Sequence, residues 1–303
     1  MPHFADRVIQ RHRSLGHPLC VGLDPHLHRI PSLFRRGDMH PGDPRTAESV
    51  EAFLLAVLER VGDRVAVVKP QIAFFEALGW RGIRVLERVV ETARKQGLLV
   101  LLDAKRGDIG STAAAYGGAY LDQDSPMPVD AMTLNPYLGR DSLDPFVERA
   151  QAHHKGLFVL VRTSNAGAED FQSQALDSGR PLFVVVAEAM EESGRKLAGP
   201  ETGWSSLGVV VGATWPGQAE EVREKLPHAL FLVPGYGAQG GGAEDALRGF
   251  VPGPQGLEGG LVNSSRGILF PPGSEEAALP VWEKRVDQAI DRAIDELGSA
   301  VRS

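Results

Sequence analysis

The chain has 303 residues, of which 43% are hydrophobic and 23% charged, and these fractions exclude intrinsic disorder over most of its length. It carries 32 Lys and Arg against 39 Asp and Glu, a net charge of −7, so no basic surplus favours nucleic acid as a partner. A single cysteine, Cys20, excludes an intrachain disulfide and a cysteine-rich zinc site. We find no secretion signal and no apolar run of about 20 residues, so we expect a cytoplasmic protein without a membrane segment.

Eight short apolar runs alternate with longer amphipathic stretches, which is the pattern of repeated βα units. Because each run is apolar throughout, we expect the strands to be buried on both faces. The pattern predicts an α/β protein with a closed (β/α)8 TIM barrel, and a doubly wound open sheet is the alternative. The predicted strands are residues 19–24, 65–69, 98–103, 129–134, 157–161, 207–212, 230–233 and 260–264.

Two of the predicted helices have clear signals. Asp43 followed by Pro44 is typical of an N-cap with proline at the first helical position. Apolar residues at helical spacing follow there, and again near the end of the chain, so each set lies on one helix face. The two sets are Val50, Phe53, Leu54, Val57 and Leu58, and Val286, Ala289, Ile290, Ala293, Ile294 and Leu297.

Two long polar connections, residues 25–44 and 165–179, follow the first and fifth predicted strands. Long loops in compact domains are commonly functional, so we interpret them as candidate lids, with neutral surface insertions as the alternative. No repeat or linker divides the chain. We therefore predict a single barrel domain over residues 1–303.

Polar side chains close several predicted strands, and the active site of such a barrel lies where the carboxyl ends of the strands meet. Asp24 ends the first strand, Lys69 the second, and the third continues as Asp103-Ala-Lys105-Arg-Gly-Asp108. Asp103 and Lys105 are two residues apart in an extended chain, so both side chains are expected on the same side.

Two carboxylates near Lys105 favour its protonated form, which makes it a fixed cation and a proton donor. A Schiff-base lysine needs the opposite environment, so this role is not expected. A purely structural ion network is the alternative, although burying several charges at a barrel mouth costs free energy.

Glycine-rich and polar segments follow the last two predicted strands, the usual phosphate site of this architecture. Pro234 opens a Pro-Gly-Tyr-Gly-Ala-Gln-Gly-Gly-Gly segment that contains Gln239, and Ser265 and Arg266 follow the eighth strand. Backbone N–H groups and a guanidinium both bind phosphate oxygens, so we expect a phosphate monoester. The same glycines satisfy G-x-G-x-x-G, but no acidic residue closes the next strand to hold the ribose of a dinucleotide.

The other candidates are weaker. Ser164 lies in Arg-Thr-Ser-Asn after the fifth strand, where hydroxyls and amides suit a heterocycle. Cys20 is expected to be a small core residue. His153 and His154 lack a third ligand at metal spacing and are expected at a solvated helix end.

The segment Leu-Leu-Asp-Ala-Lys-Arg-Gly-Asp-Ile-Gly-Ser-Thr, with its D-x-K-x-x-D pattern, resembles the signature of the orotidine 5′-phosphate decarboxylase family in its longer bacterial form. The similarity spans nearly the whole chain. Further family positions match in order at Asp24, Lys69, Ser164, Gln239 and Arg266.

The resemblance implies a barrel homodimer that uses no cofactor or metal and converts orotidine 5′-monophosphate to uridine 5′-monophosphate and carbon dioxide in pyrimidine synthesis. Asp108 and Thr112 would reach into the partner's site, Asp24 and Lys69 would contact ribose, and Ser164 the pyrimidine. The implied catalytic residues are Lys69, Asp103, Lys105 and Asp108. The implied substrate-binding residues are Asp24, Thr112, Ser164, Pro234, Gln239, Ser265 and Arg266.

Residues 25–44 and 165–179 are longer than in compact members of that family, so their contacts stay unassigned. Two other functions stay open. One is a metal-dependent sugar-phosphate decarboxylase or aldolase of the same barrel superfamily, which reuses the D-x-K-x-x-D frame around magnesium. The other is a noncatalytic protein that binds a nucleotide phosphate.

Overall fold

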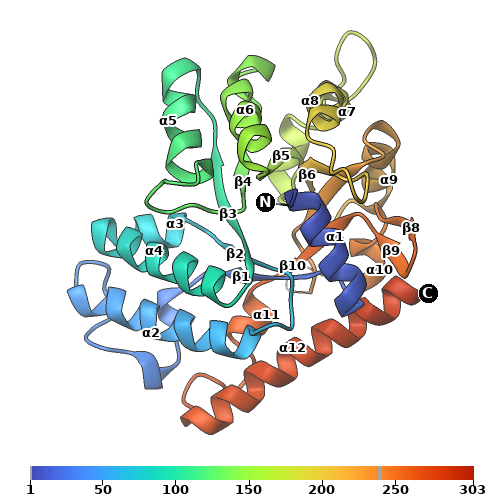
Figure 1. Ribbon diagram of the computed structural model, residues 1–303. Coiled ribbons are helices and arrows are strands. Elements are labelled where there is room, and N and C mark those ends of the chain that lie inside the picture. Colours follow the sequence, from blue (N-terminus) through green and yellow to red (C-terminus); the bar gives the residue numbers. More distant parts are fainter. Residues whose placement is uncertain (1, 238–239) are drawn as a thin grey trace.

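The computed structural model describes residues 2–237 and 240–303. Eight parallel strands close into a barrel in the order β1-β10-β7-β6-β5-β4-β3-β2 (Figure 1). The predicted TIM barrel is confirmed, and the open sheet is wrong because β1 pairs with both β2 and β10. The barrel strands are β1 (Leu19–Leu23), β2 (Val67–Pro70), β3 (Leu99–Arg106), β4 (Ala131–Leu134), β5 (Gly156–Arg162), β6 (Ser205–Val211), β7 (Ala229–Val233) and β10 (Gly260–Ser264).

Helices surround the strands (Figure 1). The α-helices are α1 (Phe4–Leu15), α2 (Pro44–Val61), α3 (Ala73–Glu76), α4 (Gly79–Lys95), α5 (Gly110–Leu121), α6 (Asp144–His153), α7 (Leu182–Ala189), α8 (Glu191–Lys196), α9 (Pro216–Lys225), α10 (Ala243–Ala246), α11 (Arg266–Leu269) and α12 (Leu279–Arg302). The 3-10 helices are η1 (Leu27–Arg29), η2 (Ser32–Phe34), η3 (Arg140–Ser142) and η4 (Ala166–Asp170).

Both helices with clear sequence signals form as predicted. The Asp43 side chain accepts a hydrogen bond from the backbone N–H of Arg45, and Pro44 is the first residue of α2. The predicted apolar faces of α2 and α12 are buried, apart from the half-buried Ile294. These faces pack on the outside of the barrel, where the larger apolar core lies.

A second, smaller apolar core fills the barrel interior. Helix α1 closes the amino-terminal end: Phe4 donates its N–H to the carbonyl of His154, and its ring meets Phe158 edge-on with centroids 6.1 Å apart. A Cβ built on Gly156 would lie 2.3 Å from the Phe4 ring, so only glycine admits this contact. Along each strand, every second side chain points into the barrel. Toward the carboxyl ends of the strands, polar side chains take the place of these apolar ones.

Several strand boundaries differ from the predictions. β2 begins at Val67 and β4 at Ala131, two residues later than expected. Val129 donates its N–H to the carbonyl of Tyr120 in α5 instead of to a strand. β3 runs on to Arg106, which pairs with Leu134. The antiparallel hairpin of β8 (Val251–Gly253) and β9 (Gly256–Glu258) was not predicted, because three-residue strands give no periodicity.

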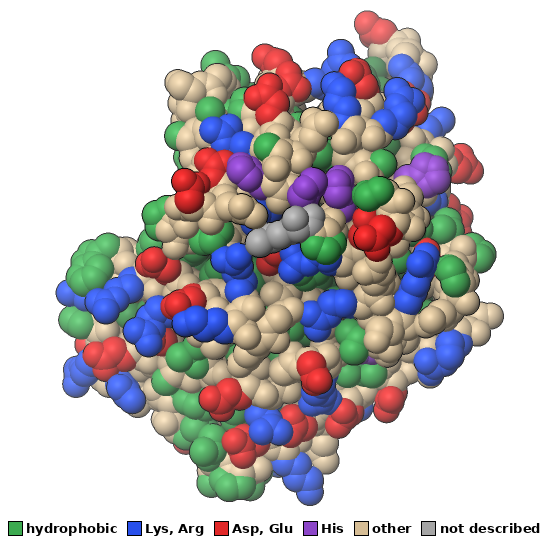
Figure 2. All heavy atoms as spheres, in the orientation of Figure 1, with side chains coloured by type: hydrophobic (Ala, Val, Ile, Leu, Met, Phe, Trp, Pro, Cys, Tyr) green, Lys and Arg blue, Asp and Glu red, His purple; other side chains and the backbone are tan. Residues whose placement is uncertain are grey.

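The first long connection, residues 25–44, packs against the outer core. Its Phe34 ring lies 5.5 Å from the ring of Phe53 in α2 and 4.9 Å from that of Trp282 in α12. On the surface drawn in Figure 2, acidic and basic side chains are interspersed. None of the helices described is both long and apolar enough to span a lipid bilayer.

Candidate active site

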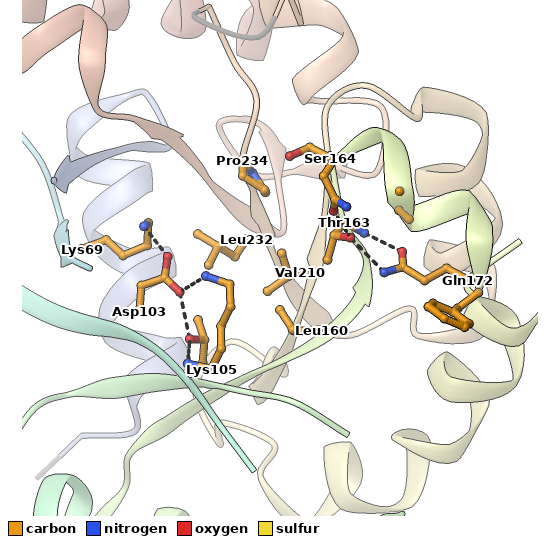
Figure 3. Close-up of a pocket in the computed structure, with 15 residues that line it drawn as sticks. Lys69, Asp103, Lys105, Leu160, Thr163, Ser164, Gln172, Val210, Leu232 and Pro234 are labelled. Atoms are coloured by element: carbon orange, nitrogen blue, oxygen red, sulfur yellow. Dashed lines mark hydrogen bonds and ion pairs between the residues drawn. The ribbon is translucent and has the colours of Figure 1, made fainter. Parts of the chain in front are cut away.

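Three charged side chains form a row at the carboxyl ends of β2 and β3 (Figure 3). Lys69 Nζ lies 2.8 Å from Oδ2 of Asp103, and Lys105 Nζ lies 2.5 Å from Oδ1 of the same carboxylate. Lys69 and Asp103 are buried, whereas the Lys105 side chain is 43% exposed. One carboxylate therefore joins a buried ammonium to an ammonium that faces open space.

The backbone at Lys105 is unusual, with φ at +47°, a region that non-glycine residues rarely adopt. The side chains of Asp103 and Lys105 meet as expected within β3, although the strand is irregular here, because its register against β4 shifts between Leu102 and Arg106. Thr133 holds this geometry: its Oγ1 accepts from the N–H groups of Ala104 and Lys105 at 2.9 and 2.8 Å. The same hydroxyl donates to Oδ1 of Asp103 at 3.0 Å.

Electrostatics keep the buried pair ionised. Burial opposes the ammonium form of Lys69, but the charges of Asp103 and Asp24 outweigh it and raise the pKa of Lys69. Burial likewise opposes the carboxylate form of Asp103, but Lys69 and Lys105 hold the pKa of that carboxyl well below its usual range. Both groups therefore keep their charges at neutral pH.

The charged row forms one wall of a cavity of about 480 Å³. Its floor is apolar and is made by Leu160, Val210 and Leu232. Figure 3 shows Ser164 across the floor from Lys105, and Pro234 also lines the cavity. An apolar floor between charged and polar walls suits a flat ring with polar edges.

The glycine-rich segment after β7 lies beside this cavity. Gly235 and Gly237 have φ of +101° and +70°, so the turn needs residues without a Cβ. Tyr236, which lies between them, is buried and donates its hydroxyl to Glu296 of α12 at 2.6 Å. This bond ties the segment to the last helix. The predicted phosphate ligand Gln239 lies outside the described residues.

Unpartnered polar atoms gather where β1 and β10 end. Within the described residues, the buried Oδ1 of Asp24, Oδ1 of Asn263 and Oγ of Ser265 have no hydrogen-bond partner. A Cβ on Gly22 would lie 2.7 Å from Cβ of Ser265 and 3.1 Å from Oδ1 of Asn263. Buried polar atoms without partners cost free energy, so this corner is suited to a polar ligand. Arg266, half-buried, follows at the start of α11.

The structure brings most of the predicted residues to one end of the barrel. Five of them line the cavity directly: Lys69, Asp103, Lys105, Ser164 and Pro234. The others near the mouth are Asp24, Ser265 and Arg266, which follow the ends of the adjacent strands β1 and β10.

Asp108 and Thr112 do not line the cavity. Asp108 is half-buried and its Oδ1 accepts the N–H of Ile109 at 2.8 Å, while Thr112 is exposed in the first turn of α5. In the described part of the chain, the ion pair of Lys105 is with Asp103, and none joins it to Asp108.

Three polar residues at this end of the barrel were not among the predicted site residues: Thr133 and Gln172, which make side-chain hydrogen bonds, and Asn263, whose buried Oδ1 has no partner. Thr133 and Asn263 lie near the carboxyl ends of β4 and β10, so the rule that found Lys69 applies to them as well. Gln172 lies in the second long connection, which lines the cavity at several positions, whereas residues 25–44 do not line it. No periodicity in the sequence marks Gln172.

Over residues 2–237 and 240–303, no three His, Cys, Asp or Glu side chains are grouped to hold a metal ion. Cys20 is fully buried in the barrel interior, and burial raises the pKa of its thiol to about 12. His153 is the last residue of α6. The expectation that no cofactor is needed stays a prediction.

The fold and the site define a (β/α)8-barrel protein with a lysine–aspartate–lysine row beside a glycine-rich turn. The sequence model of the orotidine 5′-phosphate decarboxylase / HUMPS family matches residues 17–279. The chain belongs to this family, which confirms the resemblance drawn from its motifs.

Relatives match most or all of the chain. The chain is 40% identical to orotidine 5′-phosphate decarboxylase of Rhodopirellula baltica over 306 residues, covering all of both chains. It is 39% identical to that of Clostridium novyi, covering 88% of each. The solved structure of Leishmania donovani OMP decarboxylase matches with a TM-score of 0.75 and 30% identity, covering 98% of each chain.

Proposed function

We propose that this protein is an orotidine 5′-phosphate decarboxylase, a carboxy-lyase of pyrimidine synthesis that releases carbon dioxide and uridine 5′-monophosphate. The observation that carries the proposal is the row Lys69–Asp103–Lys105 on the wall of a cavity with an apolar floor. A relative with this name aligns with the whole chain.

In this proposal each part of the nucleotide has its own binding position in the cavity or beside it. The pyrimidine lies on the apolar floor between Lys105 and Ser164, and the ribose hydroxyls contact Asp24 and Lys69. The phosphate binds the glycine-rich turn together with the segment after β10. The phosphate-side residues are Pro234, Gln239, Ser265 and Arg266. The unpartnered atoms of Asp24 and Ser265 support this orientation.

The chemical step breaks the bond between C6 of the pyrimidine and its carboxylate. The electron pair stays on C6, where no adjacent carbonyl absorbs it, and carbon dioxide leaves. The ammonium of Lys105 stabilises the developing negative charge and then gives a proton to C6, forming the new C–H bond. Lys105 recovers its proton from water.

Asp103 acts mainly through Lys105. Repulsion between two carboxylates about 4 Å apart is about 4 kcal/mol at an effective dielectric of about 20. The slowest reactions need roughly 20 kcal/mol of barrier lowering, so this repulsion is secondary. Both oxygens of Asp103 already contact ammonium groups, which weakens the repulsion further. Holding the Lys105 ammonium in place is its larger contribution.

The active protein is a homodimer with shared sites. The cavity of one chain has the Asp103 carboxylate beside Lys105, while Asp108 and Thr112 lie outside it. The neighbouring loops expose apolar side chains: Ile109 is 60% exposed and Tyr137 is 87% exposed. A second copy covering this face would bury them and place its Asp108 near Lys105. A cytoplasmic location stays a prediction.

The direct test follows the absorbance of orotidine 5′-monophosphate with purified protein, with and without a metal chelator. We expect loss of substrate at the same rate in both samples, with uridine 5′-monophosphate as the product. Activity that disappears with chelator and returns with magnesium indicates the metal-dependent sugar-phosphate enzyme instead. Tight binding of uridine 5′-monophosphate without turnover indicates a noncatalytic binding protein.

A further inference from the structure

The second long connection, residues 165–179, forms part of the cavity wall opposite the charged row. Asn165, Gly167, Ala168, Phe171 and Gln172 of this insertion line the cavity together with Thr163 and Ser164 at the end of β5. Figure 3 shows the Gln172 side chain directed toward Thr163, with dashed lines joining the two. The insertion therefore contacts the segment that presents Ser164.

Gln172 holds Thr163 at two points. Its Oε1 accepts the backbone N–H of Thr163 at 2.9 Å, and its Nε2 donates to Oγ1 of Thr163 at 2.9 Å. The Thr163 hydroxyl in turn donates to Oδ1 of Asn165 at 2.7 Å. The backbone of Gln172 is fixed as well, because its carbonyl accepts the N–H of Phe183 in α7 at 3.0 Å.

The other side of Thr163 is held by the segment after β6. Trp215 donates its indole N–H to the carbonyl of Thr163 at 3.0 Å. The guanidinium of Arg162, which has no exposed surface, lies 3.9 Å from the centre of the Trp215 ring. Arg162 also hydrogen-bonds Gln218 of α9 and, at 3.5 Å, Oε1 of Gln172. Thr163 is therefore held by hydrogen bonds with the insertion on one side and with Trp215, just before α9, on the other.

The contacts of Thr163 also fix the backbone of Ser164, while the Ser164 hydroxyl stays available to bind a ligand. A Cβ on Gly212 would lie 2.8 Å from both Cα and Cβ of Ser164, so the backbone of Ser164 is tightly packed. Its carbonyl accepts from Thr214 at 3.5 Å, and no described residue hydrogen-bonds its hydroxyl. The hydroxyl is therefore presented to the cavity by a backbone that its neighbours hold on both sides.

We propose that Gln172 is a positioning residue for Ser164. By holding the neighbouring Thr163, it keeps Ser164 in the position in which its hydroxyl contacts the pyrimidine. Gln172 therefore determines part of the affinity for the base. This inference rests on the proposed function, since it takes the cavity ligand to be a pyrimidine nucleotide. It gives the insertion 165–179 a role as a brace of the binding wall.

The test replaces Gln172 by Met, which keeps the length of the side chain and removes its two hydrogen bonds with Thr163 as well as the longer one from Arg162. We expect KM for orotidine 5′-monophosphate to rise about tenfold or more, with kcat changed much less, because the interaction positions a binding group. Gln172→Glu keeps the acceptor for the Thr163 N–H and should give an intermediate KM. Gln174→Met is the matched control, because Gln174 lies in the same insertion but outside the cavity wall.

A double-mutant comparison tests whether the effect passes through Ser164. In a Ser164→Ala background, Gln172→Met should add little to KM, since the hydroxyl that it positions is gone. An unchanged KM in Gln172→Met, or the same fold-change with and without Ser164, overturns the proposal. Two measurements separate the claims. Absence of turnover in the wild-type protein refutes the proposed function. If the Gln172→Met protein is active and calorimetry shows unchanged affinity for uridine 5′-monophosphate, the positioning role is refuted.

Discussion

At the scale of single residues, the site depends on side chains that hold other side chains. Thr133 is the clearest example in the charged row. Its one hydroxyl accepts two backbone N–H groups and donates to Asp103, so it uses its full hydrogen-bonding capacity. The positive φ of Lys105 persists because this hydroxyl satisfies the backbone there.

Replacing Thr133 by Val keeps its shape but leaves two N–H groups without an acceptor. Because each unsatisfied buried group costs about 1–3 kcal/mol, we expect the free energy of unfolding to fall by about 2–6 kcal/mol. Turnover should fall as well, since Lys105 loses its fixed position. Denaturant unfolding and steady-state kinetics measure both effects. Thr133→Ser is the control and should stay close to wild type; a Val protein with unchanged stability and turnover contradicts this account.

At the scale of elements, α1 and β5 form a matched pair at the closed end of the barrel. Phe4 on α1 is fully buried against Gly156 and Phe158, and it fills space that a Cβ on Gly156 would take. The contact joins the first helix to a strand more than 150 residues later, so it stabilises long-range structure.

Phe4→Ala is expected to lower the free energy of unfolding by about 3–5 kcal/mol, because it removes a buried aromatic ring. Gly156→Ala is expected to lower it by about 1–3 kcal/mol through overpacking. In the double variant the new methyl group enters the space left by the ring, so the combined loss should be smaller than the sum of the two single losses. Chemical denaturation of all four proteins measures this coupling. Simple additivity would mean that the two sites do not share one space.

Prediction from the sequence was most accurate where an apolar run marks a strand and a polar residue marks its carboxyl end. The eight apolar runs located all eight barrel strands, and the polar residue that closes a run located Lys69 and Asp103. The local backbone at Lys105 was not predictable, because a hydroxyl on the neighbouring strand β4 determines it. Gln172 was not predictable either, since its partner Thr163 lies nine residues away across an irregular loop.

At the scale of the whole molecule, the proposed homodimer would complete each site with a residue of the partner chain. The cavity holds Lys69, Asp103 and Lys105 from one chain, whereas Asp108 accepts the N–H of its own neighbour Ile109. The shared-site homodimer proposed above accounts for a D-x-K-x-x-D motif whose last carboxylate does not reach the lysine that precedes it.

Subunit exchange tests this assembly. Lys105→Ala and Asp108→Asn should each be inactive alone. After mixing, unfolding and reassembly, about one quarter of the sites should recover, because half of the dimers are mixed and each mixed dimer has one intact site. Activity is measured against a wild-type sample taken through the same procedure. If mixed dimers form, as mass spectrometry of labelled chains detects, and activity stays absent, then Asp108 acts within its own chain.

Helix α1 has a consequence for how small molecules travel. Its Phe4 side chain closes the amino-terminal end of the barrel, and apolar side chains fill the interior between this end and the charged row. In the part of the chain that the structure describes, the amino-terminal end of the barrel is therefore closed by apolar packing, and the cavity lies at the carboxyl ends of the strands. In the proposed reaction, substrate and products therefore pass through the same end of the barrel, so the products must leave before the next substrate binds.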